Sequence, residues 1–223
     1  MDPARGRPTK STMRLSGGAK ARRSLAAPKG SKTRPTSAKV REALFAVLGN
    51  RIEEARVLDL FAGSGALGLE AISRGAGSVV FVDNDADAVM AVRRNAVRVI
   101  DEKDRFRIMP MPAIRALRVL RGTFDVVLVD PPYDRGAGEE LATLMQRGLV
   151  AADGVVVVEH RSGEDPPLPG SLKVLKSAKY GDTTLTFAAV RPARESVPEE
   201  RAAEASSAPK PRQPARRQKS RRP

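Results

Sequence analysis

Apolar residues along the middle of the chain follow two alternating patterns, short continuous runs and stripes with helical spacing. The runs predict strands at residues 56–60, 78–82, 105–109, 124–129 and 154–159. The stripes between them predict helices at residues 64–74, 85–100, 113–120 and 139–149. Strands that alternate with helices across short loops are typical of an α/β fold. We therefore predict a doubly wound, Rossmann-like sheet, in which the valine-rich last run suits a central parallel position.

Two further segments flank this alternation. Residues 14–35 are rich in glycine and basic residues and indicate a basic loop or a short hairpin, after which Thr36 or Ser37 can cap a helix. At the other end, residues 172–178 and 183–190 predict an antiparallel hairpin at the edge of the sheet. The predicted sheet therefore has seven strands and is mostly parallel, with an antiparallel C-terminal hairpin.

The distribution of charge divides the chain into a neutral centre and two basic ends. The 223 residues carry a net charge of +14, yet residues 36–192 hold equal numbers of basic and acidic side chains. We predict a disordered leader at 1–12, one domain at 13–192 and a disordered basic tail at 193–223. Basic ends attract polyanions, and nucleic acid is the first candidate. We expect residues 13–35, the basic start of the domain, to contact RNA.

Several kinds of protein are disfavoured by what the sequence lacks. It contains no cysteine and one histidine, His160, which excludes a thiolate nucleophile and disfavours a metal site. No apolar run reaches about 18 residues, and residues 1–30 lack the apolar centre of a secretory signal. We therefore expect a cytoplasmic protein that binds neither metal nor membrane.

Three glycines follow the first strand of the predicted sheet. Gly63, Gly65 and Gly68 form the pattern G-x-G-x-x-G at the start of a helix, and Asp83 lies at the tip of the next strand. Glycines let the backbone approach a ligand, and a helix N-terminus offers N–H groups to it. Asp83 is placed to accept hydrogen bonds from two ribose hydroxyls. The pattern therefore predicts a ligand with a ribose and, we expect, an adenine.

Two classes of cofactor fit this layout, dinucleotides such as NAD and S-adenosylmethionine. Asp59, just before the glycines, favours the second class, because a carboxylate attracts the ammonium of a methionyl group and repels a pyrophosphate. The glycines alone do not separate the two.

The fourth strand ends on Asp130-Pro131-Pro132-Tyr133, a stiff segment because each proline restricts its own backbone and that of the residue before it. An exocyclic amine on a nucleobase is a poor nucleophile, since its lone pair is delocalised into the ring. Asp130 and a carbonyl near Pro131 would accept its two N–H bonds, and Tyr133 would stack on a base that has left its pairing partner. These residues predict a site for a base amine.

The two motifs together resemble the class I amino-methyltransferases, whose fourth motif is (Asn/Asp)-Pro-Pro-(Tyr/Phe). A closer resemblance links residues 13–190 to the RsmD-type 16S ribosomal RNA guanine-N2 methyltransferases. It rests on Met13-Arg14, Gly17-Gly18, Arg34-Pro35-Thr36, Val40-Arg41-Glu42, Phe45 and the run Leu58–Ala71.

This resemblance implies a seven-stranded methyltransferase fold, S-adenosylmethionine as methyl donor and one guanine of 16S rRNA as acceptor, on an assembled or assembling small ribosomal subunit. We expect the enzyme to be a monomer. By position, the residues implied at the donor site are Asp59, Phe61, Gly63, Ser64, Gly65 and Asp83. Those implied at the acceptor site are Asp130, Pro131, Pro132 and Tyr133. Arg34, Thr36 and Arg41 fall in a segment that closes over the cofactor or contacts RNA.

The sequence departs from such families after the third strand, where Met109–Ala113 contains no Asp or Asn to bind the adenine amine. Backbone groups and apolar contacts are expected to bind adenine instead. Three other functions remain open at this point: an adenine-N6 or cytosine-N4 DNA methyltransferase, an NAD-dependent oxidoreductase, and a nucleic-acid-binding protein on an inactive cofactor fold. The absence of a separate target-recognition domain disfavours the first, and the single histidine disfavours the second.

Overall fold

The computed structural model describes residues 13–28, 37–132 and 135–192 of the chain. Within them, a seven-stranded sheet has the strand order β5-β4-β3-β6-β7-β9-β8. The strands are β3 (Arg56–Leu60), β4 (Ser78–Asp83), β5 (Phe106–Pro110), β6 (Phe124–Val129), β7 (Val150–Arg161), β8 (Leu172–Tyr180) and β9 (Thr183–Val190). Strands β3 to β7 pair in parallel, and β9 pairs antiparallel with both β7 and β8. The predicted Rossmann-like sheet and its C-terminal hairpin are confirmed.

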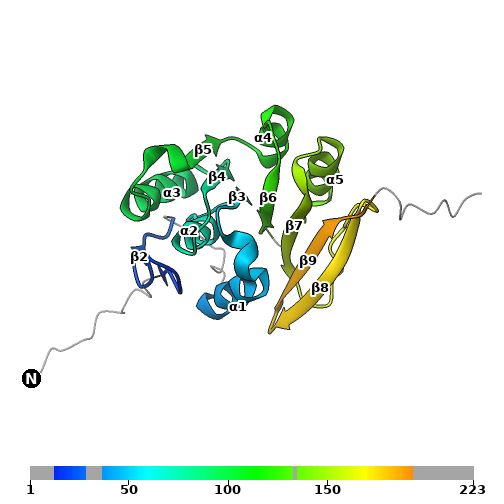
Figure 1. Cartoon of the computed structure of the whole chain (residues 1–223), viewed down its shortest axis with the longest axis horizontal. Helices are drawn as coiled ribbons and strands as arrows, with labels where there is room; N and C mark the ends of the chain where they lie inside the picture. Colours follow the sequence, from blue (N-terminus) through cyan, green and yellow to red (C-terminus); the bar gives the residue numbers. More distant parts are fainter. Residues whose placement is uncertain (1–12, 29–36, 133–134, 193–223) are drawn as a thin grey trace, which may run out of the picture. The chain divides into compact units, whose positions relative to one another are not determined.

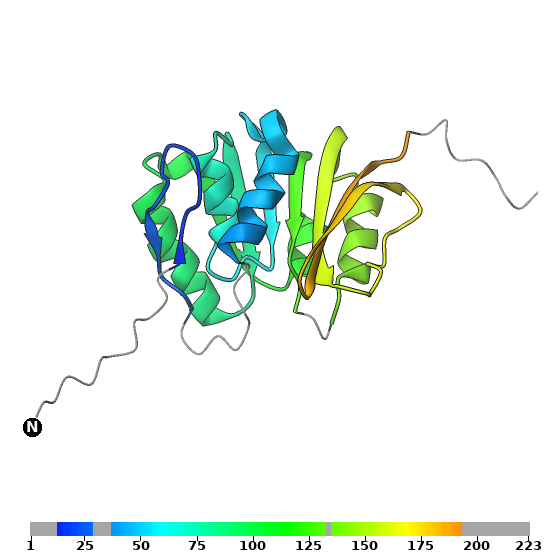
Figure 2. The same ribbon diagram turned by 90° about the horizontal axis from the view of Figure 1, so that it is seen from below.

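Helices cover both faces of this sheet (Figure 1 and Figure 2). They are α1 (Ala38–Leu48), α2 (Ala66–Ser73), α3 (Ala86–Val99), α4 (Ala113–Val119) and α5 (Gly138–Gln146), with two short 3₁₀ helices, η1 (Gly49–Ile52) and η2 (Lys103–Arg105). Apolar residues of α1, α2 and α3 form one core cluster with the sheet, and those of α4 and α5 form another. Successive strand residues, such as Val57 and Leu58, belong to opposite clusters, as expected for strands buried on both faces.

A small antiparallel hairpin, β1 (Met13–Arg14) with β2 (Ser24–Leu25), precedes α1. Of the two structures predicted for this region, a basic loop or a short hairpin, the short hairpin is confirmed. Residues 13–28 are called the N-terminal hairpin below. It covers the side of α2 that faces away from the sheet, and every residue of α2 is therefore buried.

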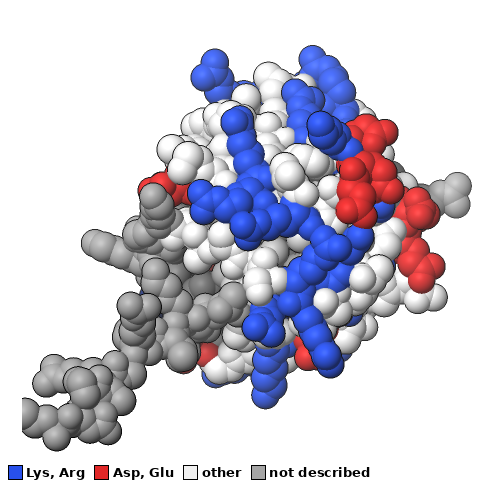
Figure 3. Space-filling model, turned by 90° about the vertical axis from the view of Figure 1, so that its left-hand side faces the viewer, with Lys and Arg blue, Asp and Glu red and all other residues white. Residues whose placement is uncertain are grey.

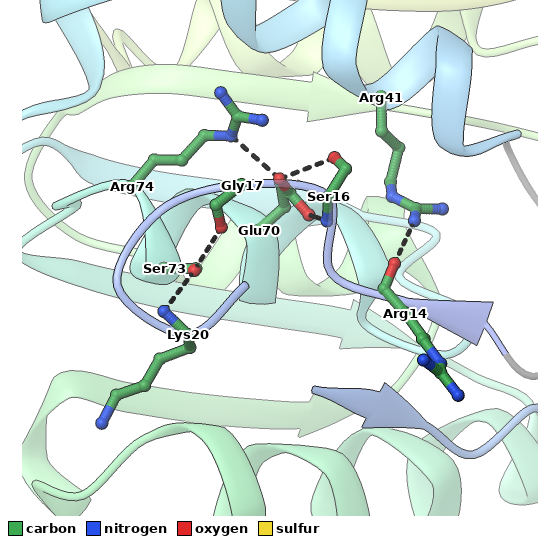
Figure 4. A network of polar contacts seen from close by, with 8 residues as sticks. All are labelled: Arg14, Ser16, Gly17, Lys20, Arg41, Glu70, Ser73 and Arg74. Carbon is green, nitrogen blue, oxygen red and sulfur yellow. Dashed lines mark hydrogen bonds and ion pairs between the residues drawn. The ribbon is translucent and has the colours of Figure 1, made fainter. Parts of the chain in front are cut away.

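Buried polar groups attach this hairpin to α2 (Figure 4). The carboxylate of Glu70, which is 0% exposed, accepts hydrogen bonds from the backbone N–H and the hydroxyl of Ser16, both at 2.8 Å, and pairs with Arg74 at 2.9 Å. The hydroxyl of Ser73 donates to the carbonyl of Gly17 and accepts the N–H of Lys20. A buried carboxylate is stable only when it is paired and hydrogen-bonded, so these contacts explain why Glu70 is tolerated there.

Several predicted boundaries, and the predicted surroundings of β7, differ from the structure. Strand β7 begins at Val150 instead of residue 154, because the Asp153-Gly154 turn signal belongs to an irregularity inside the strand. The neighbours of β7 are parallel β6 and antiparallel β9, so it does not lie between two parallel strands. Helix α2 begins at Ala66 and α5 ends at Gln146, both shorter than predicted.

Candidate active site

The order of the sheet reverses between β3 and β6, and this switch point defines the candidate site. From β3 the chain moves outward to β4 and β5, then returns to form β6 beside β3. Leu60 is paired with Val129 of β6 and with Val82 of β4. The next residues along these strands, Phe61 and Asp130 (with Asp83 on β4), therefore meet at one edge. Open α/β sheets bind their ligands in this position.

The loop after β3 is made of three left-handed backbone positions. Phe61, Gly63 and Gly65 have φ values of 63°, 55° and 76°. Glycine adopts this conformation at little cost, but a bulky residue such as Phe61 does so only under strain, which is concentrated at functional sites. A Cβ added to Gly63 would find only the carbonyl oxygen of Phe61, at 4.0 Å. The loop is therefore open above Gly63, where a ligand can approach the backbone.

Gly68, the third glycine, serves packing. A Cβ there would lie 2.4 Å from the ring of Phe81 and 2.8 Å from Val79. Helix α2 therefore packs directly against β4, and its N-terminal end is fixed relative to the sheet.

Asp83 is half-buried at the tip of β4 and supports the loop from the side. One carboxylate oxygen accepts the N–H of Gly63 at 2.8 Å, and the other accepts the N–H of Asp85 at 2.9 Å. Asp85, not Asp83, caps α3, since its side chain accepts the N–H of Ala88. A carboxylate has about four acceptor positions, so Asp83 retains capacity for hydroxyl donors.

Asp59, predicted to attract the ammonium of a methionyl group, lies beneath the loop. It is 1% exposed, and its carboxylate accepts the N–H of Gly68 at 2.9 Å. Since the N-cap of α2 is a glycine without a side chain, Asp59 supplies the capping oxygen from β3. Burial raises the pKa of Asp59 well above its ordinary value of 3.8, the N–H of Gly68 opposes this, and the charges of Asp130 and Asp83 add to it.

Asn95 of α3 was missed by the sequence analysis. It is 0% exposed, and its amide donates at 2.9 Å both to the carbonyl of Ser64 in the loop and to the carbonyl of Ala26 in the N-terminal hairpin. Its own oxygen accepts the N–H of Ala26 at 2.8 Å. One side chain thus joins the hairpin, α3 and the loop. A signal was present, because Asn95 lies three residues after Val92, inside the apolar stripe of the helix.

Ser64, predicted to bind a cofactor, makes internal contacts. Its side-chain hydroxyl donates to the sulfur of Met13 at 3.4 Å, and the residue is 8% exposed. Ser64 lies in the loop after β3, and its side chain contributes to the attachment of the N-terminal hairpin.

The segment after β6 forms the other half of the site. Asp130 is half-buried, Pro131 is buried and Pro132 is exposed. Tyr133, the fourth residue of the predicted motif, lies outside the described residues. Beyond it, the carbonyl of Pro132 accepts the N–H of Arg135 at 3.1 Å, which closes a turn.

Arg135 links the two loops. Its guanidinium pairs with buried Glu140 of α5 and lies over the ring of Phe61, 5.9 Å from the ring centroid. Phe61 thus contacts Arg135 of the segment after β6, and this contact was not predicted.

Arg41, predicted to close over the cofactor or contact RNA, is instead an internal residue. It is 1% exposed, and its guanidinium donates to the carbonyl of Arg14 at 2.6 Å (Figure 4). Burial lowers the pKa of Arg41, and nearby Glu70 opposes this shift. A guanidinium in this position stabilises the N-terminal hairpin. Arg34 and Thr36, predicted with it, lie outside the described residues.

His160 has a structural environment. One ring nitrogen is 2.9 Å from the hydroxyl of Thr186 and the other is 3.1 Å from the carbonyl of Arg161. Within the described residues, no group of three or more metal-binding side chains comes together, and no helix is both long and apolar enough to cross a membrane.

Comparison with known proteins identifies the family. The family model described as "Conserved hypothetical protein 95" matches residues 13–189. The chain belongs to this family. It is 39% identical over 176 residues to "Putative rRNA methyltransferase YlbH" of Bacillus subtilis (strain 168), covering 77% of this chain and 95% of that protein. It is 35% identical over 148 residues to "Ribosomal RNA small subunit methyltransferase D" of Escherichia coli (strain K12), covering 66% and 74%.

The fold agrees with a solved structure. "Putative methyltransferase yhhF from Escherichia coli" superposes with a TM-score of 0.71 at 30% identity, covering 81% of this chain and 98% of that one. The resemblance to RsmD-type enzymes is therefore confirmed, and the chain is a methyltransferase. Membership of this family excludes the NAD-dependent oxidoreductase.

Proposed function

We propose that this family member transfers a methyl group from S-adenosylmethionine to the exocyclic N2 amine of a guanine in 16S rRNA. The observation that carries the proposal is the juxtaposition of Phe61, Asp83 and Asp130 at the switch point. At this point, a loop suited to a ribose-bearing cofactor lies next to a carboxylate suited to a base amine.

The residues of the donor half fit S-adenosylmethionine. Asp83 keeps acceptor capacity for two ribose hydroxyls, and the backbone above Gly63 is open to the methionyl end. Pro110 is paired with Asp83, so the segment Met109–Ala113 reaches the same edge and offers backbone and apolar contacts to adenine. Bound S-adenosylmethionine supplies an electrophilic methyl group on a sulfonium.

The residues of the acceptor half then determine which nucleophile receives the methyl group. Asp130 would accept one N–H of the guanine amine, and a carbonyl near Pro131 the other. Two such acceptors orient the nitrogen lone pair and favour its tetrahedral form as the new bond develops. Tyr133 would stack on the base, which must leave the helix to enter the site. The protein forms no covalent intermediate in this mechanism.

The choice of ribosomal RNA follows the relatives. Two of them are named for rRNA methylation, one specifically for the small subunit. The basic ends of the chain suit a polyanion, whether this is free 16S rRNA, the small subunit or an assembly intermediate. With this function we propose a cytoplasmic monomer, a catalytic domain at 13–192 and terminal segments that add nonspecific affinity for RNA.

The alternative is methylation of adenine N6 or cytosine N4 in DNA, since the acceptor motif serves any exocyclic amine. A direct test uses small subunits isolated from cells that lack the gene, labelled with methyl-tritiated S-adenosylmethionine and digested to nucleosides for mass spectrometry. We expect one N2-methylguanosine per subunit, and none with Asp130→Ala. Label only in methyladenine or methylcytosine, or only in DNA, would contradict the proposal.

A further inference from the structure

One flank of the molecule, formed by the N-terminal hairpin and α3, carries far more basic than acidic side chains. The hairpin contributes Arg14, Lys20, Arg22 and Arg23 and contains no acid, while α3 contributes Arg93, Arg94 and Arg98 against one acid, Asp87. All of these basic residues except the half-buried Lys20 are exposed. Residues 36–192 are neutral as a whole, so the excess on α3 is a local property of its surface, and the hairpin, which lies outside that range, adds four more basic side chains.

Specific contacts fix the two elements relative to one another. The ammonium of Lys20 pairs with Asp101 just beyond α3 at 2.6 Å, and the guanidinium of Arg23 donates to the carbonyl of Arg98. Buried Asn95 bonds the backbone of Ala26 from the inner side of the same helix. The hairpin and α3 therefore present one continuous surface, which we call the basic flank.

Some charges of the basic flank already have partners, and others do not. Lys20 is paired, and Arg98 in the last turn of α3 also neutralises the helix dipole. Within the described part of the chain, Arg22, Arg93 and Arg94 form no ion pair. Arg94 and Arg98 are one turn apart, about 6 Å along the helix axis, and so extend the charge along one side.

Figure 3 faces the side of the molecule on which α3 and β2 lie in Figure 1. Lys and Arg side chains extend across the middle of this view, and Asp and Glu side chains gather mainly along one margin. Helix α3 begins at Ala86, three residues after Asp83, so the basic flank starts at the edge of the sheet that carries the candidate site. A polyanion on this surface would lie next to the site.

We propose that the basic flank binds the phosphate backbone of the rRNA substrate at a distance from the methylated guanine. This inference rests on the proposed function and adds a docking surface to it. Arginines presented by a rigid helix, without acidic partners, suit phosphates, and they gain affinity by releasing counterions. The surface would place the RNA while Asp130 selects the amine.

The test compares two double variants that each remove two positive charges. Arg93→Ala/Arg94→Ala alters the basic flank. Lys176→Ala/Lys179→Ala is the matched control, because both lysines are exposed on β8. Strand β8 forms one edge of the sheet, and β5, the strand that lies next to α3, forms the opposite edge. Binding to a 16S rRNA fragment and to the isolated small subunit is measured from 50 to 200 mM salt, with cofactor affinity measured by calorimetry.

We expect the arginine variant to bind RNA at least tenfold more weakly at the lowest salt. Its salt-dependence slope should fall by roughly 1.5, about 0.7–0.9 for each lost phosphate contact. Its kcat/KM for RNA should fall in parallel, with cofactor affinity unchanged, while the lysine control stays within about twofold of the wild type.

Three results would overturn the inference: an unchanged salt slope in the arginine variant, an equal loss in the lysine control, or a loss seen with the intact subunit but not with naked RNA. The last would indicate an acidic protein of the subunit as the partner. Failure of the proposed function itself is distinguishable, because the wild type would then transfer no methyl group to rRNA.

Discussion

The two loops that meet at the switch point reach a fixed shape by different means. The loop after β3 is tied by side chains from elsewhere: Asp83 bonds Gly63, Asp59 bonds Gly68 and Asn95 bonds Ser64. The segment after β6 carries two prolines that restrict it from within. A loop held by remote groups can be damaged from a distance, whereas a loop made stiff by its own residues is altered mainly by changing them.

This contrast makes different predictions for the two halves. Substitutions in the acceptor half should affect chemistry and leave cofactor binding intact. Substitution of a side chain that holds the loop after β3 should affect stability and cofactor affinity together, even when the residue contacts no ligand.

The largest effect is expected at Asp130. Asp130→Ala should lower kcat by at least about 10³-fold, roughly 4 kcal/mol, because the amine loses its acceptor, while cofactor affinity measured by calorimetry stays within twofold. Asp130→Asn is the matched control, since the amide oxygen still accepts a hydrogen bond, and it should retain much more activity. Normal turnover by the alanine variant would rule out the acceptor role of Asp130.

A smaller effect is expected at Asn95, where no ligand contact is required. Asn95→Ala leaves backbone groups of half-buried Ala26 and buried Ser64 without partners, and should cost about 2–3 kcal/mol of unfolding free energy in urea. Cofactor affinity should fall as well, because the loop loses a support.

Val97→Ala provides the control on the same helix, since Val97 is 74% exposed and its truncation should cost less than about 0.5 kcal/mol. If Asn95→Ala proved as stable as this control, the loop after β3 (the donor loop) would not depend on its hydrogen bond with Asn95.

Asp83 and Asp85 permit a comparison two residues apart. Asp83→Ala should weaken cofactor binding by about 1–3 kcal/mol in calorimetry, through loss of the ribose acceptor. Asp85→Ala removes the cap of α3 and should cost about 1 kcal/mol of stability without changing cofactor affinity. Equal cofactor affinities in the two variants would argue against ribose binding by Asp83.

The effect expected at Asp59 depends on pH. Because the folded-state pKa is raised, the stabilising contribution of the protonated form is complete below pH 3.8 and is lost as pH rises through the folded-state pKa. Asp59→Asn stays neutral and can still accept the N–H of Gly68. Its stability relative to the wild type, from urea unfolding between pH 3.5 and 8, should therefore rise with pH; a pH-independent difference would mean that Asp59 is not destabilised by its charge.

The sequence was most informative where burial is uniform. The bounds of β3 and β6 were predicted correctly, because parallel strands buried on both faces read as short continuous apolar runs. Gly63, Gly65 and Asp83 were singled out by a motif whose spacing indicates a tight turn between a strand and a helix. Asp130 followed from two neighbouring prolines.

The roles of buried polar residues were harder to predict. Glu70, Ser73 and Arg74 lie on one face of α2, which by pattern suggests a face turned to solvent, yet residues 16–20 cover it. Arg41 was placed by the family resemblance in a segment that closes over the cofactor or contacts RNA, and its burial beneath the N-terminal hairpin was likewise not visible in the local pattern. Local periodicity does not show that a distant segment will return to cover a polar face, so these roles required the tertiary structure.

The contacts of the N-terminal hairpin also bear on the order in which the protein folds. Ser16 forms a hydrogen bond with Glu70, which lies 54 residues later in the chain, and Ala26 forms one with Asn95, which lies 69 residues later. Contacts between residues so far apart in sequence form slowly, because a long loop must close before they contribute. During synthesis, the first part of the domain to leave the ribosome therefore lacks Glu70 until α2 has emerged, and it lacks Asn95 until α3 has emerged. The donor loop, which Asn95 joins to this hairpin, acquires its full support only then.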